Sequence, residues 1–224
     1  MVVDCLKLSN DGETLVKVFD KTLNQITIPN SVREIADNAF SGCASIERID
    51  IPNSVLKIGS RAFKDCISLK AIEIPDSVTS IGYSSFENCS SLESISIPNS
   101  VTEIGSSAFS GCVDLESIDL PISLRIIDDG TFFGCTSLKS ISIPNSVIEI
   151  GWGAFEDCVA LKSINIPKSV TRIQVCAFEG CSSLEDIIIP SSVSEIEGWA
   201  FDNTRWLEKQ RPVRLKSPYQ LAIR

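Results

Sequence analysis

Nine cysteines are the residues of this sequence best suited to chemistry, because a thiolate can attack a carbonyl, bind a metal or form a disulfide. A cysteine nucleophile needs a neighbouring base, usually histidine, and the sequence contains no histidine. Close Cys-x-x-Cys pairs, which are typical of zinc sites and redox motifs, are also missing. Cys5 and Cys176 stand apart, whereas the other seven recur every 23 residues, at Cys43, Cys66, Cys89, Cys112, Cys135, Cys158 and Cys181.

Carboxylates are the second class of candidate catalytic groups, since a pair of them can act as general acid and base. The sequence has 29 Asp and Glu residues, but a regular repeat offers no enclosed pocket that would shift their pKa values. Its glycines recur once per repeat and do not form a phosphate-binding loop. We therefore expect a protein that is not an enzyme, with no catalytic residues, no metal site and no cofactor.

The same 23-residue period governs several other residue types, and internal repeats decide the fold class. A serine stands two places after each repeated proline, and an isoleucine stands six places after it. The prolines are Pro29, Pro52, Pro75, Pro98, Pro121, Pro144, Pro167 and Pro190, and the phenylalanines are Phe40, Phe63, Phe86, Phe109, Phe132, Phe155, Phe178 and Phe201. Eight copies in phase predict a repeat solenoid.

One copy, residues 92–112, indicates how each unit folds. It begins with Leu-x-x-Ile-x-Ile, whose alternation predicts a strand that Pro98 ends because proline has no N–H to donate. The hydroxyl of Ser100 can then bond the local backbone of the turn. Val-x-x-Ile returns to the interior, and Gly-x-x-Ala-Phe turns the chain on the opposite side.

A single copy cannot bury its own apolar face, so the copies must stack. We expect the eight strands to form one parallel sheet above buried columns of Leu, Ile, Val, Ala, Phe and Cys. Within the Cys column, reduced thiols acting as small apolar side chains are the favoured interpretation. Disulfides and metal binding remain alternatives, since neighbouring strands ~4.8 Å apart lie within the Cα distance range of a disulfide.

The repeat Leu-x-x-Ile-x-Ile-Pro-x-Ser-Val-x-x-Ile-Gly-x-x-Ala-Phe-x-x-Cys resembles the BspA-type leucine-rich repeat, and the resemblance covers residues 23–207. It implies a right-handed, curved solenoid with a parallel β-sheet on its concave face and loops, short helical turns and short strands elsewhere. It also implies binding, since the family often occurs in surface proteins of bacteria and protozoan parasites that attach to host proteins or to other cells.

Three segments are expected. Residues 1–22 would form an N-terminal capping hairpin around the turn sequence Asn-Asp-Gly at 10–12, and residues 23–207 the eight repeats. Residues 208–224 would be a C-terminal cap or basic tail, either folded back on an acidic body or extended as an arm. Trp206 and Leu207 are expected to lie over the last repeat, where Thr204 replaces the usual cysteine.

The concave face is the candidate binding site, because every second strand residue points outward there. Its side chains are short, polar and neutral to acidic, which suits a broad protein surface or an extended peptide; simple solvation of an exposed sheet is the alternative. Copy five deviates at Ile122 and Phe133, which could form a binding patch or a local repacking, and Tyr83 and Trp152 are aromatic candidates on the opposite side. The predicted binding residues are Arg48, Asp50, Glu73, Ser94, Ser96, Ser117, Asp119, Ser140, Ser142, Ser163 and Asn165.

Charge and targeting signals limit the partners. The net charge is −9, with +5 in residues 205–224 and −14 in the rest, which opposes nucleic acid binding. No apolar run approaches 18 residues, so membrane insertion is not expected. No signal peptide is visible, which predicts an intracellular protein, whereas the resemblance favours the cell surface or secretion.

The predicted function is a non-catalytic protein-binding module, monomeric and specific for a protein partner. Cell-surface adhesion or recognition of a host protein follows if the protein is extracellular. An adaptor in protein assembly follows if it is intracellular. A structural or self-associating scaffold is the competing hypothesis, because open solenoid ends can stack head to tail.

Overall fold

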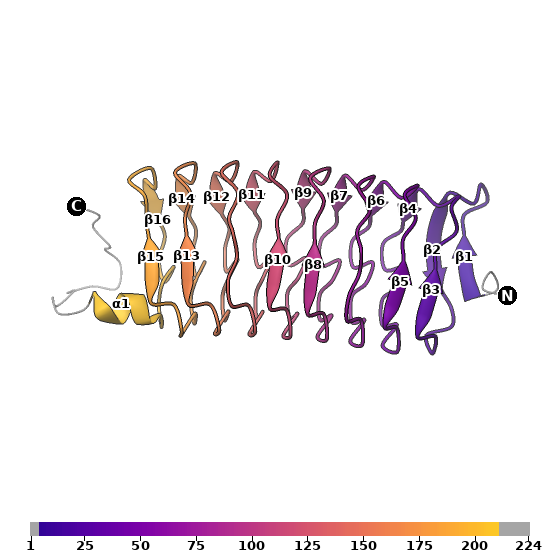
Figure 1. The fold of residues 1–224 in the computed structure, drawn as a ribbon, viewed down its shortest axis with the longest axis horizontal. Coiled ribbons are helices and arrows are strands. Elements are labelled where there is room, and N and C mark those ends of the chain that lie inside the picture. The colour runs from indigo at the N-terminus through magenta and orange to yellow at the C-terminus, as the bar shows by residue number, and fades with distance from the viewer. Residues whose placement is uncertain (1–4, 211–224) are drawn as a thin grey trace.

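Each 23-residue repeat closes one turn of a parallel β-solenoid, and successive turns stack along the long axis (Figure 1). The computed structural model describes residues 5–210. Every pairing between turns is in register, as in Ile26 beside Ile49 and Ile95 beside Ile118, so equivalent residues form straight columns. The eight-turn solenoid predicted from the proline and phenylalanine period is confirmed.

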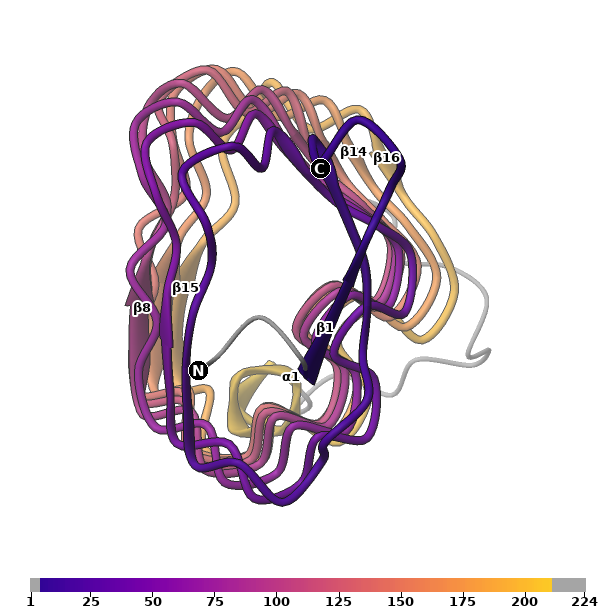
Figure 2. The same ribbon diagram turned by 90° about the vertical axis from the view of Figure 1, so that its right-hand side faces the viewer.

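Two ladders of short strands run along opposite sides of the cross-section (Figure 2). The first ladder precedes each proline and consists of β3 (Gln25–Thr27), β5 (Arg48–Asp50), β8 (Ser94–Ser96), β10 (Ser117–Asp119), β13 (Ser163–Asn165) and β15 (Asp186–Ile188). The second ladder follows each proline and consists of β4 (Glu34–Ile35), β6 (Lys57–Ile58), β7 (Ser80–Ile81), β9 (Glu103–Ile104), β11 (Ile126–Ile127), β12 (Glu149–Ile150), β14 (Arg172–Ile173) and β16 (Glu195–Ile196).

The first ladder is interrupted twice, which differs from the single sheet expected. It consists of the pairs β3–β5, β8–β10 and β13–β15, and residues 71–73 and 140–142 between them form no strand. With residues 23–45 counted as turn 1, turn 3 (residues 69–91) keeps one isolated bridge, Ala71 to Ser94. The second ladder is more continuous: β4, β6, β7 and β9 pair in one sheet, and β11, β12, β14 and β16 pair in another.

An antiparallel hairpin lies at the N-terminal end of the stack. It consists of β1 (Leu6–Leu8) and β2 (Thr14–Val18), and β2 pairs in parallel with β4. Gly12 in its turn has φ of 75°, a left-handed conformation that glycine adopts without steric cost. Leu15 and Val18 are buried, and the hairpin covers the first turn.

A short helix, α1 (Arg205–Lys209), covers one corner of the opposite end (Figure 1). Thr204 caps it, accepting a hydrogen bond of 3.1 Å from the backbone N–H of Leu207. The ring of Trp206 lies 5.0 Å from that of Phe201, and Leu207 is buried. The prediction that Trp206 and Leu207 lie over the last turn is confirmed, and the basic tail beyond residue 210 lies outside the described residues.

A column of stacked phenylalanine rings forms the centre of the core. All eight are fully buried, and neighbouring ring centroids are 5.0 to 5.7 Å apart. The predicted Leu, Ile, Val, Ala and Cys columns are buried beside them, with only isolated exceptions. Offset aromatic stacking at this distance adds to the hydrophobic stabilisation of burial.

The repeated serine after each proline has a different role from the one expected. In five turns its hydroxyl does not bond its own turn but donates to a backbone carbonyl of the preceding turn, as Ser100 does to Val78 at 2.7 Å, whereas the hydroxyls of Ser169 and Ser192 have no hydrogen-bond partner within the described residues. The distances lie between 2.6 and 2.8 Å for Ser54, Ser77, Ser100, Ser123 and Ser146. The serine therefore joins neighbouring turns.

Two residues of every turn adopt left-handed backbone conformations, at the bends after the second ladder. One series directly precedes the cysteine column and contains only Gly, Asn and Asp, the residues that tolerate this conformation: Gly42, Asp65, Asn88, Gly111, Gly134, Asp157, Gly180 and Asn203. The other series is less selective: Asn38, Arg61, Ser84, Ser107, Gly130, Gly153, Cys176 and Trp199.

Candidate functional site

The cysteine column is part of the scaffold. All seven members are buried and are free thiols. Six thiols each donate a hydrogen bond of 3.0 to 3.3 Å to the carbonyl of the phenylalanine 26 residues earlier; these are Cys66, Cys89, Cys112, Cys135, Cys158 and Cys181. The column therefore fills volume, as predicted, and also links each turn to the one before it.

Burial removes the nucleophilic character of these thiols. Desolvation raises the pKa of Cys112 well above its ordinary value and that of Cys135 to about 12. Cys176 is less buried, but desolvation and then the carboxylates of Glu179 and Glu156 raise its pKa to about 12 as well. These thiols stay protonated at neutral pH, and a protonated thiol is a poor nucleophile.

The described residues contain neither a candidate metal site nor a membrane-spanning helix. Within residues 5–210, no three Cys, Asp or Glu side chains are placed to hold a metal ion. No helix in the same part of the chain is long and apolar enough to cross a membrane. The grooves of the solenoid lie on its exposed faces.

The first-ladder face is the exposed surface of the first ladder together with segments 71–73 and 140–142. All eleven predicted binding residues lie on it: Asp50 is half-buried and the other ten are exposed. The residues between them, such as Ile49, Ile95 and Ile118, point inward and are buried. The alternation expected from the strand pattern therefore holds along this face, including the two segments that are not regular strands.

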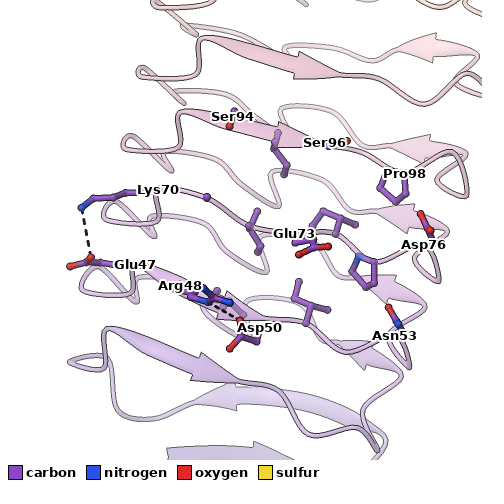
Figure 3. Close-up of a pocket in the computed structure, with 17 residues that line it drawn as sticks. Glu47, Arg48, Asp50, Asn53, Lys70, Glu73, Asp76, Ser94, Ser96 and Pro98 are labelled. Carbon is purple, nitrogen blue, oxygen red and sulfur yellow. Dashed lines mark hydrogen bonds and ion pairs between the residues drawn. The ribbon is translucent and has the colours of Figure 1, made fainter.

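A groove crosses this face over turns 2 to 4 (Figure 3). Five predicted residues line it: Ser94 and Ser96 lie on one side, Arg48 and Asp50 on the other, and Glu73 between them. The other predicted residues lie further along the face, outside the groove: Ser117, Asp119, Ser140, Ser142, Ser163 and Asn165.

Ion pairs already hold the two cations of the groove. Arg48 contacts Asp50 at 2.9 Å, and Lys70 contacts Glu47 at 3.7 Å. The hydrogen bond from Arg48, together with weaker ones from Gln25 and Thr27, lowers the pKa of Asp50. Asp50 therefore stays ionised, and the positive charge of Arg48 is largely neutralised.

Sequence reasoning missed several residues of the groove. Lys70, Asp76 and Asn53 also line it, beside the outward strand positions, and so does Ala71, an outward residue that was not among the predicted binding residues. The available signal was Ala71 itself, which has the smallest outward side chain in its column and leaves space between longer neighbours. Asp76 and Asn53 directly follow the prolines, at a position that the strand pattern does not cover.

A second groove lies on the opposite ladder. Tyr83 lines it and is 44% exposed, and the guanidinium of Arg61 lies 5.1 Å from its ring centroid, so this aromatic already has a partner. Trp152 is also exposed. In copy five, Ile122 is 71% and Phe133 39% exposed, and neither lines either groove. The binding patch considered for copy five therefore remains a prediction.

Comparison with known proteins identifies the repeat. The family model described as BspA type leucine-rich repeat region (6 copies) matches residues 17–125 and again residues 102–212. The chain belongs to the BspA-type leucine-rich repeat family. Members of leucine-rich repeat families are generally non-catalytic modules for protein interaction.

Solved structures of leucine-rich repeat proteins resemble this BspA-type chain. A leucine-rich repeat protein of T. pallidum is 29% identical with a TM-score of 0.60, and the match covers 72% of this chain and 90% of that one. One from Eubacterium ventriosum is 25% identical with a TM-score of 0.63, covering 89% of this chain and 48% of that one. The chain thus spans about half the length of the second relative. No curated protein matches it.

Proposed function

We propose that this BspA-type solenoid is a non-catalytic protein-binding module and that the first-ladder face is its binding surface. The observation that supports this most is that scaffold positions are the same in nearly every turn, whereas positions on the first-ladder face are not. The conserved columns of the repeat are buried or join turns, whereas the outward positions of the first ladder vary from turn to turn. Variation on a fixed scaffold is how repeat proteins acquire a specific extended surface.

The chemistry of the face favours a protein or extended peptide. Its middle carries short hydroxyl side chains such as Ser94, Ser117 and Ser140, which are exposed and leave low relief. Such a surface can donate and accept hydrogen bonds over several turns, directly or through water. A small apolar ligand would need a deeper and more apolar pocket than the groove around Glu73.

The kind of partner depends on the compartment in which the protein acts. At a cell surface, adhesion to another cell or to a host protein is the proposed role, as the family resemblance implies. In a reducing interior, which suits a column of seven reduced thiols, the role is an adaptor in protein assembly.

The test is capture on an immobilised protein from a cell lysate and from a panel of extracellular-matrix proteins. Wild type is compared with the triple variant Ser94→Arg, Ser117→Arg, Ser140→Arg. A matched control carries Thr79→Arg, Thr102→Arg and Thr171→Arg at a position where Arg33 and Arg125 already occur naturally. A protein that wild type and the control retain and the first variant loses supports the proposal, and equal retention by all three contradicts it.

A self-associating scaffold is the second candidate, and the C-terminal end of the stack favours it. Within residues 5–210, no strand pairs with the outer edges of β15 and β16. Ile187 and Ile196 are only half-buried there, and Ile188 is 73% exposed where earlier turns have polar residues. Unpaired edges and apolar ends allow head-to-tail stacking. Light scattering over a concentration series decides: a constant monomer mass excludes this candidate.

A further inference from the structure

Turn 3 departs from the other turns at three places that all line the groove. Ala71 has the shortest outward side chain of its column. Residues 71–73 form no regular strand, a feature that turn 3 shares with residues 140–142. Glu73 carries a carboxylate, and so does Asp76 directly after the proline. At the position of Asp76, the other seven turns have Asn, Ile, Lys or Ser, so turn 3 alone presents both carboxylates.

These two carboxylates differ from the others in the groove because nothing neutralises them. Glu47 and Asp50 are paired with Lys70 and Arg48. Within the described part of the chain, no hydrogen bond or ion pair joins the side chain of Glu73 or Asp76 to another residue, and both are exposed. The groove therefore carries an uncompensated negative charge at the end nearest Pro98 and Asn53 (Figure 3).

We propose that this groove binds a cationic, extended segment of the protein partner, with a lysine or arginine side chain between Glu73 and Asp76. The inference rests on the proposed function and adds the chemistry of the partner. The small side chain of Ala71 leaves room for the aliphatic part of such a long side chain. The two carboxylates accept its charge-assisted hydrogen bonds, which are stronger than neutral ones.

The remaining lining fits the backbone of such a segment. Ser94 and Ser96 lie on the next turn with exposed hydroxyls, and Asn53 contributes an amide that both donates and accepts. Arg48 does not oppose a cation strongly, because its contact with Asp50 at 2.9 Å neutralises much of its charge. The acidic body of the protein adds long-range attraction for a basic partner.

The experiment uses a fluorescein-labelled 12-residue peptide of alternating lysine and serine, titrated with the full-length protein by fluorescence anisotropy. The same peptide with acetylated lysines and a glutamate–serine peptide serve as ligand controls. The double variant Glu73→Gln, Asp76→Asn is compared with the control Glu103→Gln, Asp114→Asn, which removes the same charge from exposed sites outside the groove.

We expect the lysine peptide to bind the wild type and the control variant, and to bind the groove variant about tenfold more weakly. The acetylated and glutamate peptides should not bind. The inference is overturned if the lysine peptide does not bind, or if both variants bind it alike. The two claims can fail separately. A captured protein that the Ser94→Arg, Ser117→Arg, Ser140→Arg variant loses and the Glu73→Gln, Asp76→Asn variant retains would support the first-ladder face as the binding surface and contradict the cationic segment.

Discussion

The thiol of Cys112 donates a hydrogen bond to the backbone carbonyl of Phe86, with sulfur 3.2 Å from oxygen. The carbonyl belongs to the preceding turn and also accepts a bond of 3.1 Å from the N–H of Cys89. The same arrangement recurs at six of the seven column cysteines, and the thiol of each of the six bonds to the turn before its own. A residue type that first suggests nucleophilic chemistry is here a structural link between repeats.

Replacing this thiol should weaken the stack. Cys112→Ala removes the inter-turn hydrogen bond and leaves a small void, so we expect a loss of about 1–2 kcal/mol in the free energy of unfolding. Urea unfolding followed by far-UV circular dichroism measures it. A midpoint equal to that of wild type would show that the bond and the packing of the sulfur contribute nothing.

The buried thiols should also make the protein sensitive to alkaline pH. Burial raises the pKa of Cys89, Cys112 and Cys158, so the folded state keeps these protons while the unfolded chain loses them above about pH 9. The free energy of unfolding should therefore fall as pH rises beyond that value. Urea unfolding between pH 7 and pH 10.5 tests this, and the triple variant of these cysteines to alanine should show a shallower fall.

The phenylalanine column should be the most costly to interrupt. Phe109 is fully buried between Phe86 and Phe132, so Phe109→Ala should destabilise the protein by about 3–5 kcal/mol. That is a large part of the ~5–15 kcal/mol typical of a whole domain. Phe133→Ala is the matched control, because this neighbouring ring is 39% exposed and should lose less than about 1.5 kcal/mol. Equal losses in the two variants would contradict the core assignment.

One buried position should become more stable on substitution. Ser85 occupies the column that holds alanine in six turns; it is fully buried, and its hydroxyl has no hydrogen-bond partner within the described residues. Ser85→Ala should therefore raise the free energy of unfolding by about 1 kcal/mol. Thr131→Ala at the equivalent position should give no such gain, because its hydroxyl donates to the carbonyl of Asp128 at 2.7 Å. Unfolding midpoints of the two variants decide.

The period alone predicted the buried columns, because stacking eight similar units in register places Phe109 and Cys112 in columns with their equivalents from the other turns. It could not reveal that the repeated serine and cysteine bond to the neighbouring turn, since the direction of a side-chain hydrogen bond depends on the offset between turns. The left-handed residue before each cysteine was readable in principle, because Gly, Asn and Asp alone occupy it.

The face was predictable and the groove was not. Strand alternation placed Ser94, Ser117 and the other outward residues correctly. The groove is lined by residues that depart from the repeat consensus, Ala71 on the strand and Asp76 after the proline. A repeat pattern describes the residues that the turns share, so it does not predict a groove lined in part by residues found only in turn 3.

The most direct test of the central claim is the affinity of a captured protein for three forms of the solenoid, measured by surface plasmon resonance. Ser94→Arg, Ser117→Arg, Ser140→Arg places three long side chains on the first-ladder face, and Thr79→Arg, Thr102→Arg, Thr171→Arg places the same charge elsewhere. The account predicts at least about a tenfold rise in Kd for the first variant and a change below about twofold for the second. Equal Kd values for the two variants would contradict it and exclude the first-ladder face as the binding surface.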